Sequence, residues 1–163
     1  MEYTGNKEQA FVEMLDKYKG VIAKVCCVYI SPRADFDDLY QETVANLWQG
    51  FDKFRGDSKP STWIYRVAIN TCITWARTNR KYSDNTRLEN DLPVYVEDSS
   101  RLEEYRRLQG LIMKLDPLEK AIVTLWLDEN SYDDIASITG LSRSNVAVKF
   151  HRIKAKMAKM SAD

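Results

Sequence analysis

The amino-acid sequence predicts an all-α protein of two small helical domains joined by a flexible linker. The chain has 163 residues, a length that accommodates one ordinary domain or two small ones. It contains only six Gly and four Pro, which favours long helices over a turn-rich β fold. Apolar residues recur with a helical period on both sides of residues 83–100, where the period is lost. We therefore predict domains at 1–82 and 101–163, with 83–100 as an acidic linker between them.

The composition is that of a globular protein and gives no sign of a membrane segment. Apolar residues make up 44% of the chain and charged residues 29%. No apolar run approaches the ~20 residues needed to cross a bilayer. The polar start of the chain, residues 1–10, lacks the apolar centre of a signal peptide. We therefore expect a cytoplasmic protein that does not insert into a membrane.

The first domain should contain three helices. Residues 6–30 carry apolar side chains at helical spacing, and Pro32 ends this helix because proline disfavours helical geometry in the residue before it. The second helix covers residues 36–51, and a polar loop with Gly and Pro separates it from a third helix over 62–82. The second helix has one apolar face and one polar face. The polar face comprises Asp38, Gln41, Glu42 and Asn46.

The second domain should begin with two helices. One starts near Arg101 and the next starts at Asp116. Asp116 can cap its helix, since Pro117 suits the first helical position and Glu119 can complete a capping box. The apolar face of this helix is expected to pack in the core and comprises Ala121, Ile122, Leu125 and Trp126.

The last segment has the pattern of a helix-turn-helix. Ser131 and Asp134 form another capping-box pattern before a short helix, Gly140 supplies a tight turn, and Ser142 can cap the final helix. A helix, a short turn with glycine and a second helix are the arrangement of many DNA-binding domains. The alternative is a solvated amphipathic helix at the end of the chain. The buried face of the final helix should comprise Val146, Phe150, Ile153 and Met157.

The formal net charge of zero conceals an uneven distribution of charge. The chain has 24 Lys and Arg against 24 Asp and Glu. Residues 58–82 carry five basic residues and no acidic one, and residues 135–160 carry six basic residues and no acidic one. Residues 83–104 hold seven acidic residues against two basic ones. Each cationic segment can neutralise several DNA phosphates, although either one alone could also be the solvated side of a helix.

Aromatic residues are interleaved with the first cationic segment. Trp63 and Trp75 lie among basic and polar residues of the third predicted helix and the loop before it. Cationic surfaces with aromatic side chains suit single-stranded or flipped bases, at roughly 1–3 kcal/mol per stacked base. The alternative is that the tryptophans belong to the core, which we favour for Trp75 because it continues the apolar line of its helix. For Trp63, at the start of the helix, both interpretations stay open.

The sequence lacks the patterns of a catalytic or metal site. The chain has one His and three Cys, and Cys26, Cys27 and Cys72 form no CxxC pair. In a reducing compartment we interpret these cysteines as small buried apolar side chains rather than redox groups. A Gly-rich phosphate loop and a nucleophile–base pattern are also missing. We therefore expect neither an enzyme nor a cofactor.

Three stretches in this order resemble one family, the bacterial sigma factors. Residues 37–48 (DDLYQETVANLW) look like the helix that binds RNA polymerase. Residues 54–70, with FRGDS and STWIYRVAIN, resemble the segment that melts and reads the promoter minus-ten element. Residues 115–152, with YDDIA, GLS and HR, resemble the helix-turn-helix that reads the minus-35 element. The length matches the minimal two-domain, extracytoplasmic-function group and leaves no room for the further domains of housekeeping sigma factors.

The resemblance implies a role for each matching position. Core RNA polymerase would be contacted by Asp38, Gln41, Glu42 and Asn46. The minus-ten element would be contacted by Gly56, Asp57, Ser58, Lys59, Trp63, Arg66, Asn70 and Arg77, with residues 56–59 forming the loop that captures a flipped base. The minus-35 duplex would be contacted by Arg143, Ser144, Lys149 and Arg152, with Arg143 and Ser144 nearest the base edges. The implied partners are core RNA polymerase, promoter DNA and an anti-sigma factor, which in this family is often membrane-bound.

A few positions depart from the family pattern. Ala147 and Val148 stand where the family often has a basic or polar pair, so methyl contacts or DNA shape would matter more there. Trp75 stands where a polar residue is common. The competing interpretation is a two-domain helix-turn-helix regulator that acts without replacing the sigma subunit. That interpretation explains the end of the chain but neither residues 37–48 nor the loop followed by Trp63.

Overall fold

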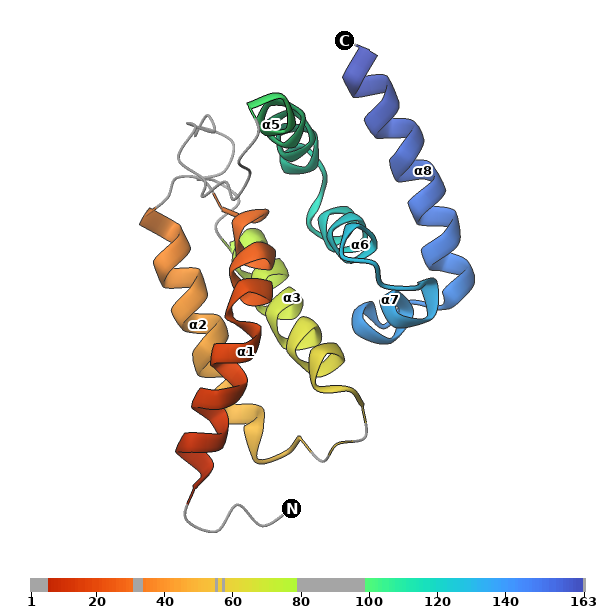
Figure 1. Ribbon diagram of the computed structural model, residues 1–163. Helices are drawn as coiled ribbons and strands as arrows, with labels where there is room; N and C mark the ends of the chain where they lie inside the picture. Colours follow the sequence, from red (N-terminus) through yellow and green to blue (C-terminus); the bar gives the residue numbers. More distant parts are fainter. Residues whose placement is uncertain (1–5, 31–33, 55, 57, 79–98, 163) are drawn as a thin grey trace.

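The computed structural model describes residues 6–30, 34–54, 56, 58–78 and 99–162 (Figure 1). All regular secondary structure within these residues is α-helical, which confirms the predicted fold class. The predicted linker lies outside the described residues, apart from two serines at the start of a helix. The helices described are α1 (Lys7–Cys27), α2 (Ala34–Phe51), α3 (Pro60–Thr78), α5 (Ser99–Met113), α6 (Pro117–Leu127), α7 (Tyr132–Thr139) and α8 (Arg143–Ala162).

The first three helices pack against one another through their apolar faces and form the N-terminal helix group (Figure 1). Along α2, the fully buried side chains are Leu39, Thr43 and Leu47, at intervals of four residues. The hydroxyl of Thr43 donates to the Leu39 carbonyl oxygen (2.9 Å), which satisfies this polar group inside the core. Phe11 of α1 meets Trp48 of α2 edge to face, with 5.0 Å between ring centroids. The apolar period of the sequence therefore determines which face of α2 is packed.

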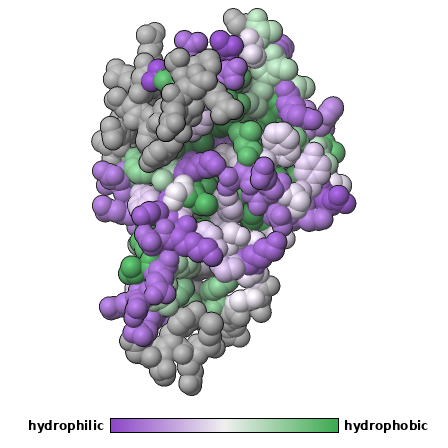
Figure 2. Space-filling model, in the orientation of Figure 1, coloured by the Kyte–Doolittle hydropathy of each residue, from purple (hydrophilic) through white to green (hydrophobic). Residues whose placement is uncertain are grey.

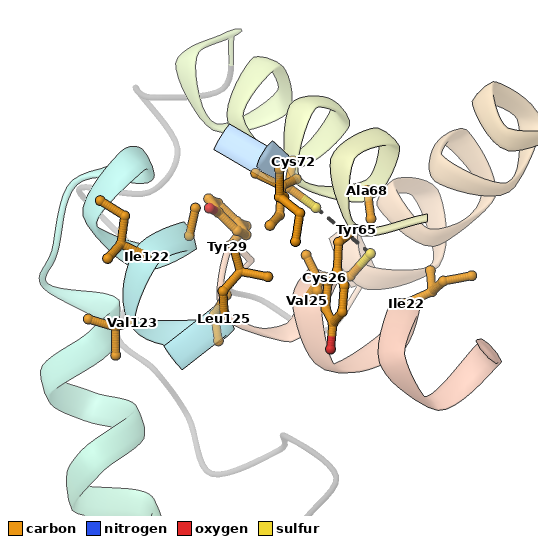
Figure 3. Close-up of a cluster of buried hydrophobic side chains, with 14 of the residues drawn as sticks. Ile22, Val25, Cys26, Tyr29, Tyr65, Ala68, Cys72, Ile122, Val123 and Leu125 are labelled. Carbon is orange, nitrogen blue, oxygen red and sulfur yellow. Dashed lines mark hydrogen bonds between the residues drawn. The ribbon is translucent and has the colours of Figure 1, made fainter. Parts of the chain in front are cut away.

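Two buried thiols meet where α1 contacts α3 (Figure 3). The Sγ of Cys72 donates to the Sγ of Cys26 over 3.9 Å. The hydrogen bond to Cys26 and burial both raise the pKa of Cys72, and burial raises the pKa of the half-buried Cys27 to about 11. A protonated thiol is a poor nucleophile. The positions of Cys26 and Cys72 confirm the interpretation of these cysteines as buried apolar side chains.

Capping boxes start α6 and α7, as the sequence predicts. The Asp116 carboxylate accepts from the Glu119 N–H (2.9 Å), and the Glu119 carboxylate accepts from the Asp116 N–H (3.0 Å). The Ser131 hydroxyl accepts from the Asp134 N–H (3.1 Å), and the Asp134 carboxylate accepts in return from the Ser131 N–H (3.3 Å). Each box satisfies backbone donors that a helix start would otherwise leave unpaired.

A glycine turn then joins α7 to α8. Gly140 has φ +81°, a left-handed conformation that glycine adopts without the steric cost of a side chain. The Ser142 hydroxyl accepts from the Asn145 N–H (3.1 Å) and caps α8. Helix α8 packs on α5, α6 and α7, on the side away from the N-terminal helix group (Figure 1). The side chains that it buries are Val146, Phe150 and Ile153.

The expectation that Trp126 packs within the core is wrong. Its side chain is 45% exposed, whereas Ile122 and Leu125 of the same helix are fully buried. The Trp126 ring lies over Phe150, with 4.8 Å between ring centroids. Trp126 therefore covers a core residue with one side and meets solvent with the rest, because it stands near the exposed end of α6.

The C-terminal helix group, α5–α8, packs directly on the N-terminal group. Helix α3 contacts both α6 and α7 (Figure 1), and buried side chains of both groups form one cluster (Figure 3). The Tyr29 hydroxyl, just after α1, donates to the Pro117 carbonyl oxygen (2.7 Å). Lys24 of α1 forms an ion pair with Asp128 after α6 (2.7 Å). The sequence pattern did not indicate this contact between the groups.

A lysine is buried in the contact between the two groups. Lys120 of α6 is only 9% exposed, and its Nζ lies 5.5 Å from the centroid of the Tyr29 ring. Burial lowers the pKa of Lys120 to about 8, and the nearby Asp116 carboxylate only partly opposes this effect. Because the pKa is lower in the folded protein than in the unfolded chain, burial of the charged ammonium favours unfolding at pH 7.

We predict that Lys120→Met stabilises the protein at pH 7 by on the order of 1–3 kcal/mol, since it removes the penalty of burying a charge. The gain should shrink as pH rises from about 8 to 10.5, because the folded wild-type protein loses the Lys120 proton over that interval while the unfolded chain retains it. Urea unfolding at pH 7 and at pH 10 measures both effects. Lys114→Met, at an exposed lysine, is the matched control and should not reproduce the pH dependence. A gain that is the same at both pH values would contradict the prediction.

Candidate nucleic-acid and protein interfaces

The polar face of α2 is directed to solvent. Asp38, Gln41 and Glu42 are exposed, opposite the buried side chains of the same helix. Asn46 is half-buried, and its Nδ2 donates to the Thr71 hydroxyl of α3 (2.9 Å). Asn46 therefore fastens α2 to α3, a structural contact that the sequence pattern did not indicate. Two carboxylates and one amide remain on an exposed helix face, which suits a basic protein surface.

The loop between α2 and α3 turns at a glycine. Gly56 is exposed and has φ +77°, so a side chain there would be strained. Ser58 is half-buried and Lys59 is exposed. Asp57, which the resemblance places in the base-capturing loop, lies outside the described residues. The ammonium group of Lys59 and the backbone at Gly56 are therefore exposed to solvent beside the start of α3.

Trp63 belongs to the packing that holds this loop. Its ring stacks on Phe54, with 4.9 Å between ring centroids, and lies 6.4 Å from the ring of Phe51. A Cβ on Gly50 would stand 3.3 Å from Trp63 Cζ2, so the small residue leaves room for the indole. Trp63 is half-buried, and its role toward DNA stays a prediction. Trp75 is also half-buried and packs against the core, as favoured from the sequence.

Helix α3 carries a basic line directed partly at the other helix group. Arg66, Asn70 and Arg77 lie on one side of the helix at spacings of four and seven residues. Asn70 and Arg77 are exposed, whereas Arg66 is half-buried. The Nη2 of Arg66 donates to the Ser137 carbonyl oxygen of α7 (2.9 Å). A residue expected at the minus-ten element thus contacts the helix-turn-helix.

The final helix exposes the face expected to meet DNA. Ser144 and Arg152 are exposed, and Lys149 beside them is half-buried. Arg143 is exposed, and its Nε lies 3.5 Å from the Asp133 carboxylate of α7. An exposed ion pair of this length contributes little stability, so Arg143 can leave Asp133 for another anion at small cost. The ion pair at Arg143 is a contact that the sequence pattern did not reveal.

The three predicted surfaces do not converge on one site. Figure 1 places α2 and α8 on opposite sides of the molecule, with α3 between them. The face in Figure 2 is covered mainly by hydrophilic and intermediate residues, with hydrophobic residues visible in between. The arrangement therefore offers separate contact surfaces.

Among the described residues, no cluster of three His, Cys, Asp or Glu could hold a metal ion, and no helix is long and apolar enough to span a membrane.

Helix α8 exposes two further side chains near its start, Asn145 and Val148. Val148 is a position where the sequence departs from the family pattern, and a valine on the polar face of an amphipathic helix breaks the periodicity. Asn145 was not singled out from the sequence, since an asparagine near a helix start is common.

Comparison with known protein families gives two matches along the chain. Sigma-70 region 2 matches residues 14–82, and sigma-70 region 4 matches residues 105–157. The first match covers most of the N-terminal helix group, and the second covers most of α5, all of α6 and α7, and most of α8. The two matched segments stand on either side of the predicted linker.

Curated relatives carry the same family name. The chain is 33% identical over 131 residues to the RNA polymerase sigma factor YlaC of Bacillus subtilis, and the match covers 75% of each protein. It is 29% identical over 163 residues to the ECF RNA polymerase sigma-E factor of Haemophilus influenzae, covering 90% of this chain and 85% of the relative. The sigma-E factor of Escherichia coli K12 is 24% identical over 161 residues, covering 90% of this chain and 84% of the relative.

Solved structures share the fold over nearly the whole chain. CnrH, in complex with the cytosolic domain of CnrY, superposes with a TM-score of 0.70 and 24% identity, covering 98% of this chain and 92% of CnrH. The sigma factor RpoE of Bartonella quintana, in complex with the anti-sigma factor NepR, gives a TM-score of 0.75 with 16% identity. That match covers 94% of this chain and 98% of RpoE. At such low identity the superpositions establish the fold alone.

Proposed function

The chain belongs to the sigma-70 family of RNA polymerase sigma factors, and we propose which of its surfaces contact polymerase and which contact the promoter. It is an extracytoplasmic-function-type member that directs promoter-specific transcription initiation. Residues 1–82 bind core polymerase and the minus-ten element, and residues 101–163 read the minus-35 element. Residues 83–100 connect these two domains. The observation that carries this division is the pair of family matches, 14–82 and 105–157, on either side of the linker. The protein acts in the cytoplasm and supplies no catalytic group of its own.

The exposed face of α2 is the proposed contact to core polymerase. Asp38, Gln41 and Glu42 are free to meet a basic protein surface, while Asn46 supports the face from within through its bond to Thr71. Charge complementarity across such an interface contributes mainly to association rate and specificity.

Reversing charge on this face should weaken the interaction with core polymerase. We expect Asp38→Lys combined with Glu42→Lys to lower the affinity by about tenfold or more, because two attractive charges become repulsive. Both side chains are exposed, so the circular dichroism spectrum and melting temperature should stay close to wild type. Fluorescence anisotropy with labelled protein and core polymerase measures the affinity. The matched control is Glu103→Lys with Glu104→Lys on α5, an equal charge change elsewhere; normal affinity in the α2 variant would refute the proposal.

The minus-ten contact is proposed for the loop before α3 and the basic line of that helix. Gly56, Ser58 and Lys59 would meet an extruded base with Asp57, while Arg66, Asn70 and Arg77 would follow the strand. Trp63 holds the loop through its stacking on Phe54. Stacking and phosphate contacts can offset the few kcal/mol that base flipping costs.

The exposed face of α8 is the proposed reader of the minus-35 element. Arg143 and Ser144 stand in its first turn, where residues of a recognition helix reach base edges, and Lys149 and Arg152 are placed for phosphates. The Arg143–Asp133 ion pair would open when Arg143 turns to the groove.

Two arginine variants should separate these roles. Arg152→Ala should weaken the minus-35 contact by a similar factor on every promoter variant, since a phosphate contact carries no sequence information. Arg143→Ala should also change the preference at one base pair, by about 1–3 kcal/mol. Run-off transcription with core polymerase on genomic fragments first identifies the promoter, and the same assay on its single-base variants measures both effects. If Arg143→Ala acts equally on all variants, its assignment to base readout is wrong.

Binding of both promoter elements requires the two helix groups to separate. Positions minus-ten and minus-35 are about 25 base pairs apart, which is roughly 85 Å along B-form DNA. In the structure, Arg66 of the minus-ten surface is hydrogen-bonded to Ser137 of the helix-turn-helix at 2.9 Å. The packed arrangement is therefore the one adopted away from the promoter, and core polymerase would hold the groups apart.

A reducible crosslink between the groups tests this separation. Lys24 and Asp128 form an ion pair (2.7 Å) across the contact, and neither belongs to a proposed DNA or polymerase surface. We expect Lys24→Cys with Asp128→Cys, joined by a short disulfide-containing bismaleimide in a Cys27→Ser background, to lose promoter-specific transcription. Reducing the disulfide within the crosslinker should restore promoter-specific transcription. The singly labelled Lys24→Cys protein is the control, and full activity of the crosslinked form would contradict the required separation.

An anti-sigma factor is the proposed regulator. Of the two superposed structures, one holds CnrH bound to the cytosolic domain of CnrY and the other holds a sigma factor bound to the anti-sigma factor NepR. Both matches cover more than nine-tenths of this chain. Co-purification of the tagged chain from its own cells after mild crosslinking would identify this partner.

A further inference from the structure

One exposed apolar side chain lies in the middle of the proposed DNA-reading face. Val148 of α8 is 48% exposed. The large hydrophobic residues exposed in the described part of the chain are Val12, Tyr105, Trp126, Leu127 and Val148, and Val148 alone among them belongs to α8. The position is the sixth residue of the helix and therefore stands in its second turn.

The surroundings of Val148 are polar. Ser144 lies one turn before it and Arg152 one turn after it, both exposed. The buried residues nearest in sequence, Val146 and Phe150, stand about 160° away around the helix. Val148 therefore points away from the core of its own domain and is not needed to hold α8 in place.

A protein partner is a poor explanation for this exposure. Docking surfaces are contiguous apolar patches, whereas the exposed neighbours one turn away from Val148 are all polar and comprise Ser144, Asn145, His151 and Arg152. The segment 135–160 carries six basic residues and no acidic one, so the face attracts polyanions. The occupant should therefore be a polyanion that also displays a small apolar group.

The major groove of DNA meets this description. Its base edges present hydrogen-bond donors and acceptors throughout, and the one apolar group among them is the C5-methyl of thymine. A valine between a first-turn serine and a third-turn arginine can reach that methyl while the flanking residues contact bases and phosphate.

We propose that Val148 packs against the C5-methyl group of a thymine in the minus-35 element and makes the protein specific for thymine at that position. The assignment rests on the proposed placement of α8 at this element. Burying one methyl group corresponds to about a fourfold change in affinity. Lys149 and Arg152 then supply binding strength without sequence preference, and Val148 adds discrimination at a base pair of its own beside that of Arg143.

Replacement of thymine by deoxyuridine is the direct test, because it deletes the methyl group and preserves base pairing. The affinity of the holoenzyme, core polymerase with the full chain, is measured on promoter fragments in which each minus-35 thymine of either strand is replaced singly. The wild-type holoenzyme should lose about fourfold in affinity at one thymine. Val148→Ala should bind the unmodified fragment about fourfold more weakly and show no further loss at that position. Val12→Ala, an equally truncated exposed valine on α1, should behave as wild type.

Several outcomes would overturn the assignment. These are a minus-35 element without thymine, a wild-type holoenzyme indifferent to every replacement, and an undiminished methyl effect in Val148→Ala. A fourth is a Val148→Ala protein that binds core polymerase more weakly without DNA, which would place Val148 at a protein contact. Failure of the underlying function looks different, since the holoenzyme would then leave the minus-35 region unprotected against cleavage by nuclease.

Discussion

The packing of α3 against α6 and α7 is the contact on which the arrangement of the whole molecule depends. Within α1–α3 this helix supplies Ile64, Ala68 and Cys72 to the core, and its other side meets the C-terminal helix group. The buried side chains of both groups consequently form one cluster. The proposed minus-ten surface lies along the same helix. Any change in the contact between the groups therefore changes how much of that surface is accessible.

This contact is built so that it can be released. An interface closed by apolar side chains alone would resist opening, but here a buried lysine, Lys120, opposes closure at neutral pH because its charge is poorly solvated. The Arg66–Ser137 hydrogen bond and the exposed Lys24–Asp128 ion pair are both replaced at little cost, by phosphate in the first case and by water in the second. Such contacts favour a packed state without locking it, which suits the proposed binding of two separate promoter elements.

Sequence patterns predicted the individual helices well because their causes are local. The capping boxes at Asp116 and Ser131 and the glycine turn at Gly140 depend on residues within one helical turn. The contact between the groups depends on residues far apart in the chain, such as Tyr29 and Pro117, which no periodicity reveals. The hydrogen bond between Asn46 and Thr71 likewise joins residues that are far apart in the chain. The exposure of Trp126 also depends on tertiary structure, because it is set by where α6 ends relative to Phe150.

Helix α3 shows why the apolar pattern does not reveal the contact. Its buried residues spread over about 160° of its circumference and are Ile64, Tyr65, Ala68, Ile69, Thr71 and Cys72. A helix packed on one neighbour needs an apolar stripe about 100° wide, and α3 already packs on both α1 and α2, so a wide stripe does not indicate a further partner. The candidate contact residues could not be assigned by pattern either, because exposure alone does not identify the ligand, and Arg66 and Asn46 are engaged inside the molecule.

The balance of charge fits a protein that binds DNA only as part of a larger assembly. A free subunit with a large positive charge would be held by nonspecific DNA, whose attraction grows with the number of phosphates neutralised. With 24 basic and 24 acidic residues, this chain keeps its cations on two segments and balances them elsewhere. If both segments contact DNA as proposed, useful affinity would arise when polymerase holds both on one promoter, as two linked sites reinforce each other. Neutral total charge thus limits binding by the free chain without removing the local charge that promoter contact needs.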